Sequence, residues 1–154
     1  MTNNSFLRSL RYAIKLSDSD MVTIFKLADH DVPLSQIMTF LLKEDDAGYV
    51  ECSDSVLGFF LDGLIILKRG PKEPTPDQPA KISQPLTHNA KLKKLRIALE
   101  LKEDAMFRIL ELGGVAISKP ELTALFRNKD HKNYKECGDQ FLRNFLKGLS
   151  LYRR

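Results

Sequence analysis

The chain has 154 residues, of which 43% are hydrophobic and 8% aromatic, and its net charge is +4. No apolar run approaches the roughly 20 residues that a membrane-spanning helix needs, so we expect neither a transmembrane segment nor a membrane partner. The first residues, Met1 to Phe6, lack the basic and apolar regions of a secretory signal, which predicts a cytoplasmic protein.

Two helices are predicted near the N-terminus. Apolar residues recur at helical spacing from Phe6 to Ile14, which indicates a first helix. The polar cluster Ser17 to Asp20 offers N-cap candidates and first-turn acidic residues for a second helix, which should end near residues 29–31.

A third helix is predicted after Val32-Pro33, and a fourth follows an acidic loop, residues 44–51. Ser53 and Asp54 are expected to cap the fourth helix. Gly63 lies in the middle of that helix, where Gly costs up to about 1 kcal/mol relative to Ala. Its presence therefore predicts close contact with another backbone.

The chain then repeats itself. One constant shift carries Leu10-Arg11 onto Leu95-Arg96, and both halves align without a gap. This duplication predicts an all-α protein of two similar units, residues 1–70 and 87–154, each with about four helices and related by approximate twofold symmetry. Units of about 70 residues have small cores, so we expect them to pack on each other. Residues 71–86 hold five of the seven prolines and should form a linker.

Three long, positionally fixed strings carry a resemblance to a known family. These strings are Lys43 to Asp54, Phe60 to Ile65 and His131 to Leu149. They resemble the YehS-like family of bacterial proteins, which consist of this domain in duplicate, and the likeness covers the chain apart from the linker. The resemblance implies the helical tandem fold and carries no activity, because the function of that family is unknown.

A Tyr-x-x-Cys-x-Asp motif occurs once in each half. Its members are Tyr49, Cys52, Asp54, Tyr134, Cys137 and Asp139. A Cys just before a helix can have a lowered pKa and act as a thiolate, but a nucleophile also needs a base and oxyanion donors. We therefore expect the Tyr and Cys to pack the loop onto the core and the Asp to cap the helix. No disulfide between the two thiols is expected in a reducing cytosol.

Arg11 and Arg96 are equivalent and lie within the apolar face of a helix. An Arg in this position needs a carboxylate, and the candidates are Asp54 and Asp139, or Asp45 and Asp130. Unpaired arginines that line a pocket would instead indicate an anion site.

The residues needed for a metal or cofactor site are not grouped in the sequence. There is no Cys-x-x-Cys, His-x-x-x-His or His-Glu-x-x-His spacing, and the acidic loop matches no calcium-binding loop. Gly113-Gly114 has the pattern of a helix C-cap rather than of a phosphate-binding loop. We predict no metal, no cofactor and no catalytic residues.

The charges are unevenly distributed. Residues 1–70 have a net charge of −3 and residues 87–154 a net charge of +7. The basic half suits nucleic acid, since two of its helices resemble a helix-turn-helix. The candidate contacts are Lys91, Lys93, Lys94, Lys119, Arg127, Lys129 and Lys132. Alternatively, the basic half docks on the acidic half.

Four sites are apolar in the first half and polar in the second. Leu34, Leu42, Phe59 and Ile65 correspond to Lys119, Arg127, Asn144 and Ser150. The first half thus carries extra apolar surface for the other half, another subunit or a partner. We predict a non-enzymatic interaction module that binds a protein partner or itself. Nucleic-acid binding is the alternative, and an enzyme with a site between the repeats is a third hypothesis.

Overall fold

A computed structural model describes residues 1–70 and 86–153, which form eight helices and no strand. The first repeat contains α1 (Asn3–Ile14), α2 (Asp18–Leu27), α3 (Leu34–Phe40) and α4 (Asp54–Arg69). The second contains α5 (His88–Ala98), α6 (Glu103–Leu112), α7 (Lys119–Leu125) and α8 (Asp139–Tyr152). The predicted all-α class is confirmed. The predicted linker, residues 71–86, lies outside the described residues except for Leu86.

Polar caps start most of these helices. Ser17 forms a capping box with Asp20 at α2, and Ser118 forms the same arrangement at α7. Ser53 alone caps α4, because its side chain accepts a hydrogen bond from the backbone N–H of Val56. The predicted capping role of the Asp in the repeated motif is wrong, since this Asp is the first residue of α4 and of α8 and its carboxylate binds elsewhere.

Glycine permits the closest helix contact in each repeat. A Cβ on Gly63 of α4 would lie 1.9 Å from the carbonyl oxygen of Ile24 on α2. A Cβ on Gly148 of α8 would lie 1.9 Å from the carbonyl oxygen of Ile109 on α6. The backbones are therefore in direct contact, as the sequence predicts.

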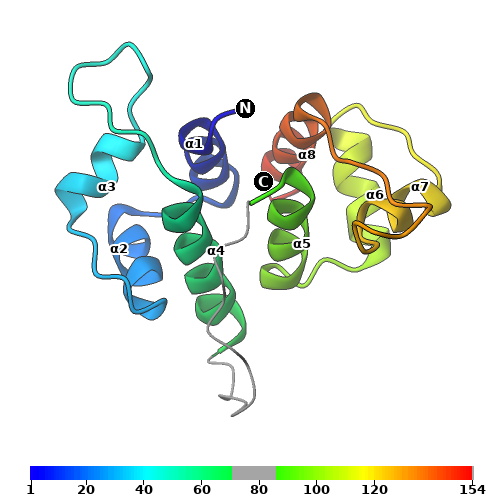
Figure 1. Ribbon diagram of the computed structural model, residues 1–154, viewed down its shortest axis with the longest axis horizontal. Coiled ribbons are helices and arrows are strands. Elements are labelled where there is room, and N and C mark those ends of the chain that lie inside the picture. Colours follow the sequence, from blue (N-terminus) through cyan, green and yellow to red (C-terminus); the bar gives the residue numbers. More distant parts are fainter. Residues whose placement is uncertain (71–85, 154) are drawn as a thin grey trace.

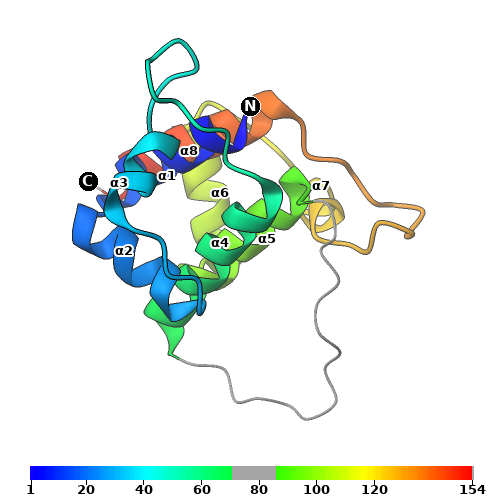
Figure 2. The same ribbon diagram turned by 60° about the vertical axis from the view of Figure 1, so that its left-hand side comes forward.

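The repeats pack side by side. Helix α4 lies against α5, and α1 lies against α8, so the two repeats are related by an approximate twofold axis (Figures 1 and 2). Ion pairs join Asp62 to Lys94 and Arg69 to Glu100 across this contact. The cation comes from the second repeat in the first pair and from the first repeat in the other. The buried core continues through both repeats.

A membrane-crossing helix is not found among the described residues, since none of their helices is both long and apolar enough.

The glycine contact can be tested within a single helix. Gly63→Ala should lower the free energy of unfolding by about 3 kcal/mol, because α2 and α4 must move apart. A Cβ on Gly58, also in α4, would meet no atom within 4 Å. Gly58→Ala should therefore raise the free energy of unfolding by up to about 1 kcal/mol. Urea denaturation of both variants measures the difference, and equal stabilities would contradict the contact.

Candidate functional site

A buried asparagine near the start of each repeat holds the long loop after the third helix. The side-chain amide of Asn4 donates to the carbonyl oxygens of Phe40 (3.1 Å) and Val50 (2.8 Å) and accepts from the N–H of Cys52 (2.9 Å). Asn89 makes the three equivalent bonds in the second repeat. Our reading of the sequence missed this pair, although the internal repeat aligns the two residues.

The loop held in this way carries the motif cysteine into the core. Cys52 and Cys137 are 2% and 3% exposed. Burial, with a smaller contribution from the adjacent Asp, raises the pKa of Cys52 to about 12 and that of Cys137 to about 11. Both thiols are therefore protonated and shielded, which contradicts a reactive thiolate. The motif tyrosines, Tyr49 and Tyr134, are half-buried.

The motif aspartates bind the starts of both repeats. Asp54 accepts from the Asn3 amide of its own repeat at 2.7 Å and from the N–H of Leu86, just before α5, at 3.3 Å. The hydrogen bond from Asn3 is the main cause of the lowered pKa of Asp54.

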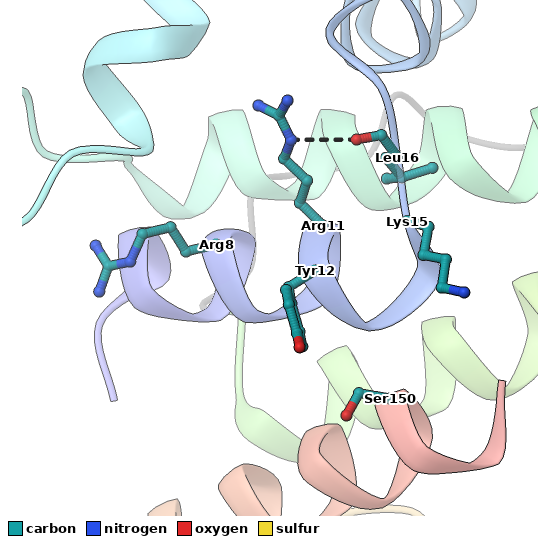
Figure 3. Close-up of a pocket in the computed structure, with 6 residues that line it drawn as sticks. All are labelled: Arg8, Arg11, Tyr12, Lys15, Leu16 and Ser150. Carbon is teal, nitrogen blue, oxygen red and sulfur yellow. Dashed lines mark hydrogen bonds between the residues drawn. The ribbon is translucent and has the colours of Figure 1, made fainter. Parts of the chain in front are cut away.

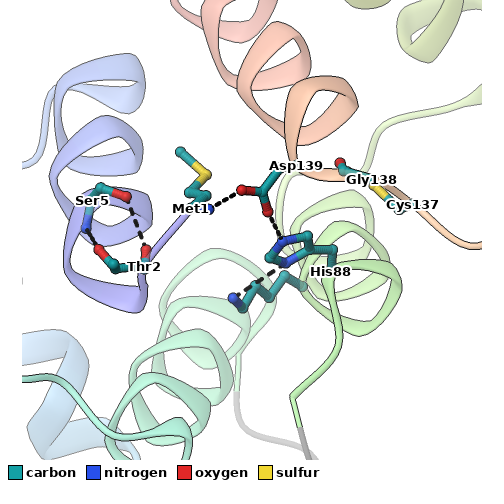
Figure 4. A network of polar contacts seen from close by, with 8 residues as sticks. Met1, Thr2, Ser5, His88, Cys137, Gly138 and Asp139 are labelled. Atoms are coloured by element: carbon teal, nitrogen blue, oxygen red, sulfur yellow. Dashed lines mark hydrogen bonds and ion pairs between the residues drawn. The ribbon is translucent and has the colours of Figure 1, made fainter.

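Asp139 makes the symmetry-equivalent pair of contacts (Figure 4). Its carboxylate lies 2.5 Å from Nε2 of His88 in its own repeat and binds the amino group of Met1 from the other repeat. The bond to Met1 and then that to His88 lower the pKa of Asp139 to about 2. Each aspartate therefore connects α1 and α5, so these groups join the repeats.

Lys91 lies buried at this contact, with 2% of its surface exposed. Its ammonium group is 5.4 Å from the centre of the Phe6 ring and 3.5 Å from Nδ1 of His88. Burial lowers the pKa of Lys91, while Asp54 and Asp139 oppose this shift. The prediction that Lys91 contacts nucleic acid is wrong, because its side chain is inside the protein.

The remaining groups at this contact bind one another rather than leaving ligands for a metal. Among the residues that the structure describes, no three His, Cys, Asp or Glu side chains are grouped so that they could hold a metal ion.

The repeated arginines do not pair as the sequence analysis expected. Arg11 binds Asp18 and donates to the carbonyl oxygen of Leu16, so its predicted pairing with Asp54 or Asp45 is wrong. Arg96 donates to the carbonyl oxygen of Leu101 and forms no ion pair within the described residues, so its predicted pairing with Asp139 or Asp130 is also wrong.

The other predicted nucleic-acid contacts do not share one location. Lys94 is used at the repeat contact, where it binds Asp62. Five candidates have exposed side chains, namely Lys93, Lys119, Arg127, Lys129 and Lys132. The last three lie in the loop between α7 and α8, so nucleic-acid binding through this half stays a prediction.

The predicted apolar sites also differ in their surroundings. Leu34 and Phe59 are 38% and 39% exposed, whereas Leu42 is half-buried. Ile65 packs against the core and lies between Asp62, which binds Lys94 of α5, and Arg69, which binds Glu100 just after that helix. Its helical spacing places it on the α4 face that meets the second repeat.

Comparison with known proteins identifies the family. Residues 3–70 and 88–154 each match the family described as "Protein of unknown function (DUF1456)". The chain belongs to this family. A family relative in Escherichia coli (strain K12), "Uncharacterized protein YehS", is 45% identical over 150 residues, which cover 97% of this chain and 95% of that protein. The resemblance to the YehS-like family and the tandem duplication are thereby confirmed. No solved structure matches the chain.

Thiol accessibility provides one test of the site. In the native protein at about pH 8, Cys52 and Cys137 should alkylate slowly, since a pKa near 11 or 12 leaves roughly a thousandth or less of each thiol ionised. Both should react after denaturation, as followed by mass spectrometry. A Ser55→Cys variant supplies an exposed control thiol in α4, and native cysteines that react as fast as this control would contradict the burial.

Lys91→Met tests the buried ammonium group. Near pH 7 the variant should be more stable by about 1 kcal/mol, because the unfavourable burial of a charge is removed. Between its lowered pKa and the ordinary value of 10.5, Lys91 binds fewer protons in the folded than in the unfolded chain. The stability of the unsubstituted protein should therefore rise with pH relative to the variant. Urea denaturation measures the free energy of unfolding of both proteins at about pH 7 and pH 10. The difference between the variant and the unsubstituted protein should be smaller at pH 10, and a difference that does not change with pH would refute this account.

Proposed function

We propose that the protein is a non-enzymatic interaction module that binds a protein partner through its first repeat. The contact would be made by the first-repeat apolar surface, which we define as Leu34, Met38 and Phe59. These side chains are 38%, 41% and 39% exposed. The equivalent residues of the second repeat are Lys119, Thr123 and Asn144. Since the same fold accepts polar residues at these positions, the apolar side chains favour a contact outside the repeat.

The members of this surface are arranged around the connection between α2 and α3. The ring of His30, in that connection, stacks on Phe59 with 4.5 Å between ring centres. Leu34 begins α3 four residues later, and Met38 lies one turn further along the same side of the helix. Leu27, the last residue of α2, is also exposed. This arrangement supports one binding region rather than isolated apolar residues.

Acidic residues beside the apolar surface indicate the chemistry of the partner. The loop that follows α3 projects from the first repeat (Figures 1 and 2). It carries Glu44, Asp45 and Asp46, all of which are exposed. A partner segment with apolar side chains and flanking Lys or Arg would complement both features. The buried, protonated thiols are consistent with a role in binding rather than in catalysis.

The proposal can be tested by placing the second-repeat residues at the equivalent positions of the first repeat, which carries little risk to folding. A variant with Leu34→Lys, Met38→Thr and Phe59→Asn receives side chains that the second repeat already accommodates. Self-association or partner binding should weaken by about tenfold or more, because loss of a central interface side chain costs about 2 kcal/mol or more. Sedimentation velocity measures self-association, and quantitative affinity capture measures partner binding.

The matched control carries Lys119→Ala, Thr123→Ala and Asn144→Ala at the equivalent positions and should bind as the unsubstituted protein does. The proposal would be contradicted by two results together. The unsubstituted protein would be a monomer, and the first-repeat variant and the control variant would capture the same proteins in the same amounts.

A further inference from the structure

A basic pocket lies beside the second repeat, where the end of α4 meets α5 and the start of α6. Its volume is about 590 Å³, which is in the usual range of small-ligand sites. Four cations line it, namely Arg69, Lys93, Arg96 and Lys102, and among the described residues Glu100 is the one acidic residue in the lining. These charges sum to +3. We call this site the Arg96 pocket.

Arg96 is held in place by contacts that, among the described residues, leave its charge uncompensated. Its Nε donates to the carbonyl oxygen of Leu101 at 3.1 Å, and its guanidinium carbon lies 4.6 Å from the centre of the Phe126 ring. Neither contact supplies a negative charge, and Arg96 has no carboxylate partner in the part of the chain that the structure describes. Glu100 instead binds Arg69 at 3.5 Å. A fixed guanidinium group without a counter-ion is suited to bind an anion.

The equivalent arginine of the first repeat, Arg11, has a carboxylate partner. Arg11 makes the same Nε bond, to the carbonyl oxygen of Leu16, but its terminal nitrogen also binds Asp18. The residue equivalent to Asp18 is Glu103, and its carboxylate binds Lys119 at 3.7 Å. The second repeat therefore keeps a carboxylate at this position but directs it away from the arginine.

The pocket around Arg11 is a weaker candidate. It has a volume of about 360 Å³ and lies between α1 and Ser150 of α8. Arg8, Arg11 and Lys15 point in different directions from α1 (Figure 3). Arg8 also donates to the carbonyl oxygen of Leu42, and Arg11 is paired, so these charges do not converge on one ligand.

We propose that the Arg96 pocket binds the phosphate groups of a small phosphorylated ligand. The planar guanidinium group of Arg96 can donate two parallel hydrogen bonds to phosphate oxygens, and Lys93 and Lys102 add positive charge. Ile97 and Phe126 also line the pocket and offer apolar contacts to the rest of such a ligand. The phosphodiester backbone of a single-stranded nucleic acid presents the same chemistry, so the experiment must distinguish these two sources.

Calorimetric titration of the full-length protein tests this site with pyrophosphate, ATP and a single-stranded oligonucleotide, each at low and moderate salt. Pyrophosphate or ATP should bind, and moderate salt should weaken the binding. Arg96→Gln should weaken it by about tenfold or more, because hydrogen bonds to charged groups are strong. Arg11→Gln is the matched control and should leave the affinity unchanged.

A second variant addresses folding, since Arg96 also holds Leu101. Lys93→Gln combined with Lys102→Ser should weaken binding similarly and preserve the fold, because the equivalent of Lys102 is Ser17, which caps α2. Absence of binding to pyrophosphate and ATP at low salt would overturn the proposal, as would equal losses from Arg96→Gln and Arg11→Gln. Binding of the oligonucleotide alone would also overturn it and assign the pocket to a nucleic-acid backbone.

Discussion

Three hydrogen bonds to one buried amide fix the longest connection in each repeat. Asn4 and Asn89 satisfy backbone groups at both ends of the loop between the third and fourth helices. Because buried polar groups must be paired, this arrangement determines where the loop returns to the core. The motif cysteine becomes buried as a result, and the aspartate two residues later reaches the start of the other repeat. The contact between the repeats thus depends on an interaction within each of them.

The two repeats keep this framework while individual side chains differ between them. Phe6 in the first repeat corresponds to Lys91 in the second, and the two residues contact each other near the twofold axis. Asp18 neutralises Arg11, whereas its equivalent, Glu103, binds Lys119, so Arg96 has no counter-ion within the described ranges 1–70 and 86–153. The two copies thus differ inside the molecule, at Phe6 and Lys91, as well as on its surface, and each copy serves as an internal comparison for the other.

This divergence places different chemistry on the two repeats. The first repeat exposes apolar side chains beside an acidic loop, which suits a protein surface of apolar and basic character. The second concentrates positive charge around a pocket, which suits phosphate. The aspartates, the histidine and the buried lysine lie between these regions and join the repeats.

The sequence by itself determined the local features of this protein. Helical spacing, the caps at Ser17 and Ser53 and the internal repeat all depend on residues close in the chain or on direct alignment, so they could be predicted. Gly63 indicated a close contact because a glycine, Gly148, stands at the same mid-helix position of the second repeat. Only the tertiary structure decided the ionic partners. Arg11 had several candidate carboxylates in the sequence and binds Asp18, and Lys94 binds Asp62 of the other repeat. These choices depend on distances between helices that separate segments of the chain bring together.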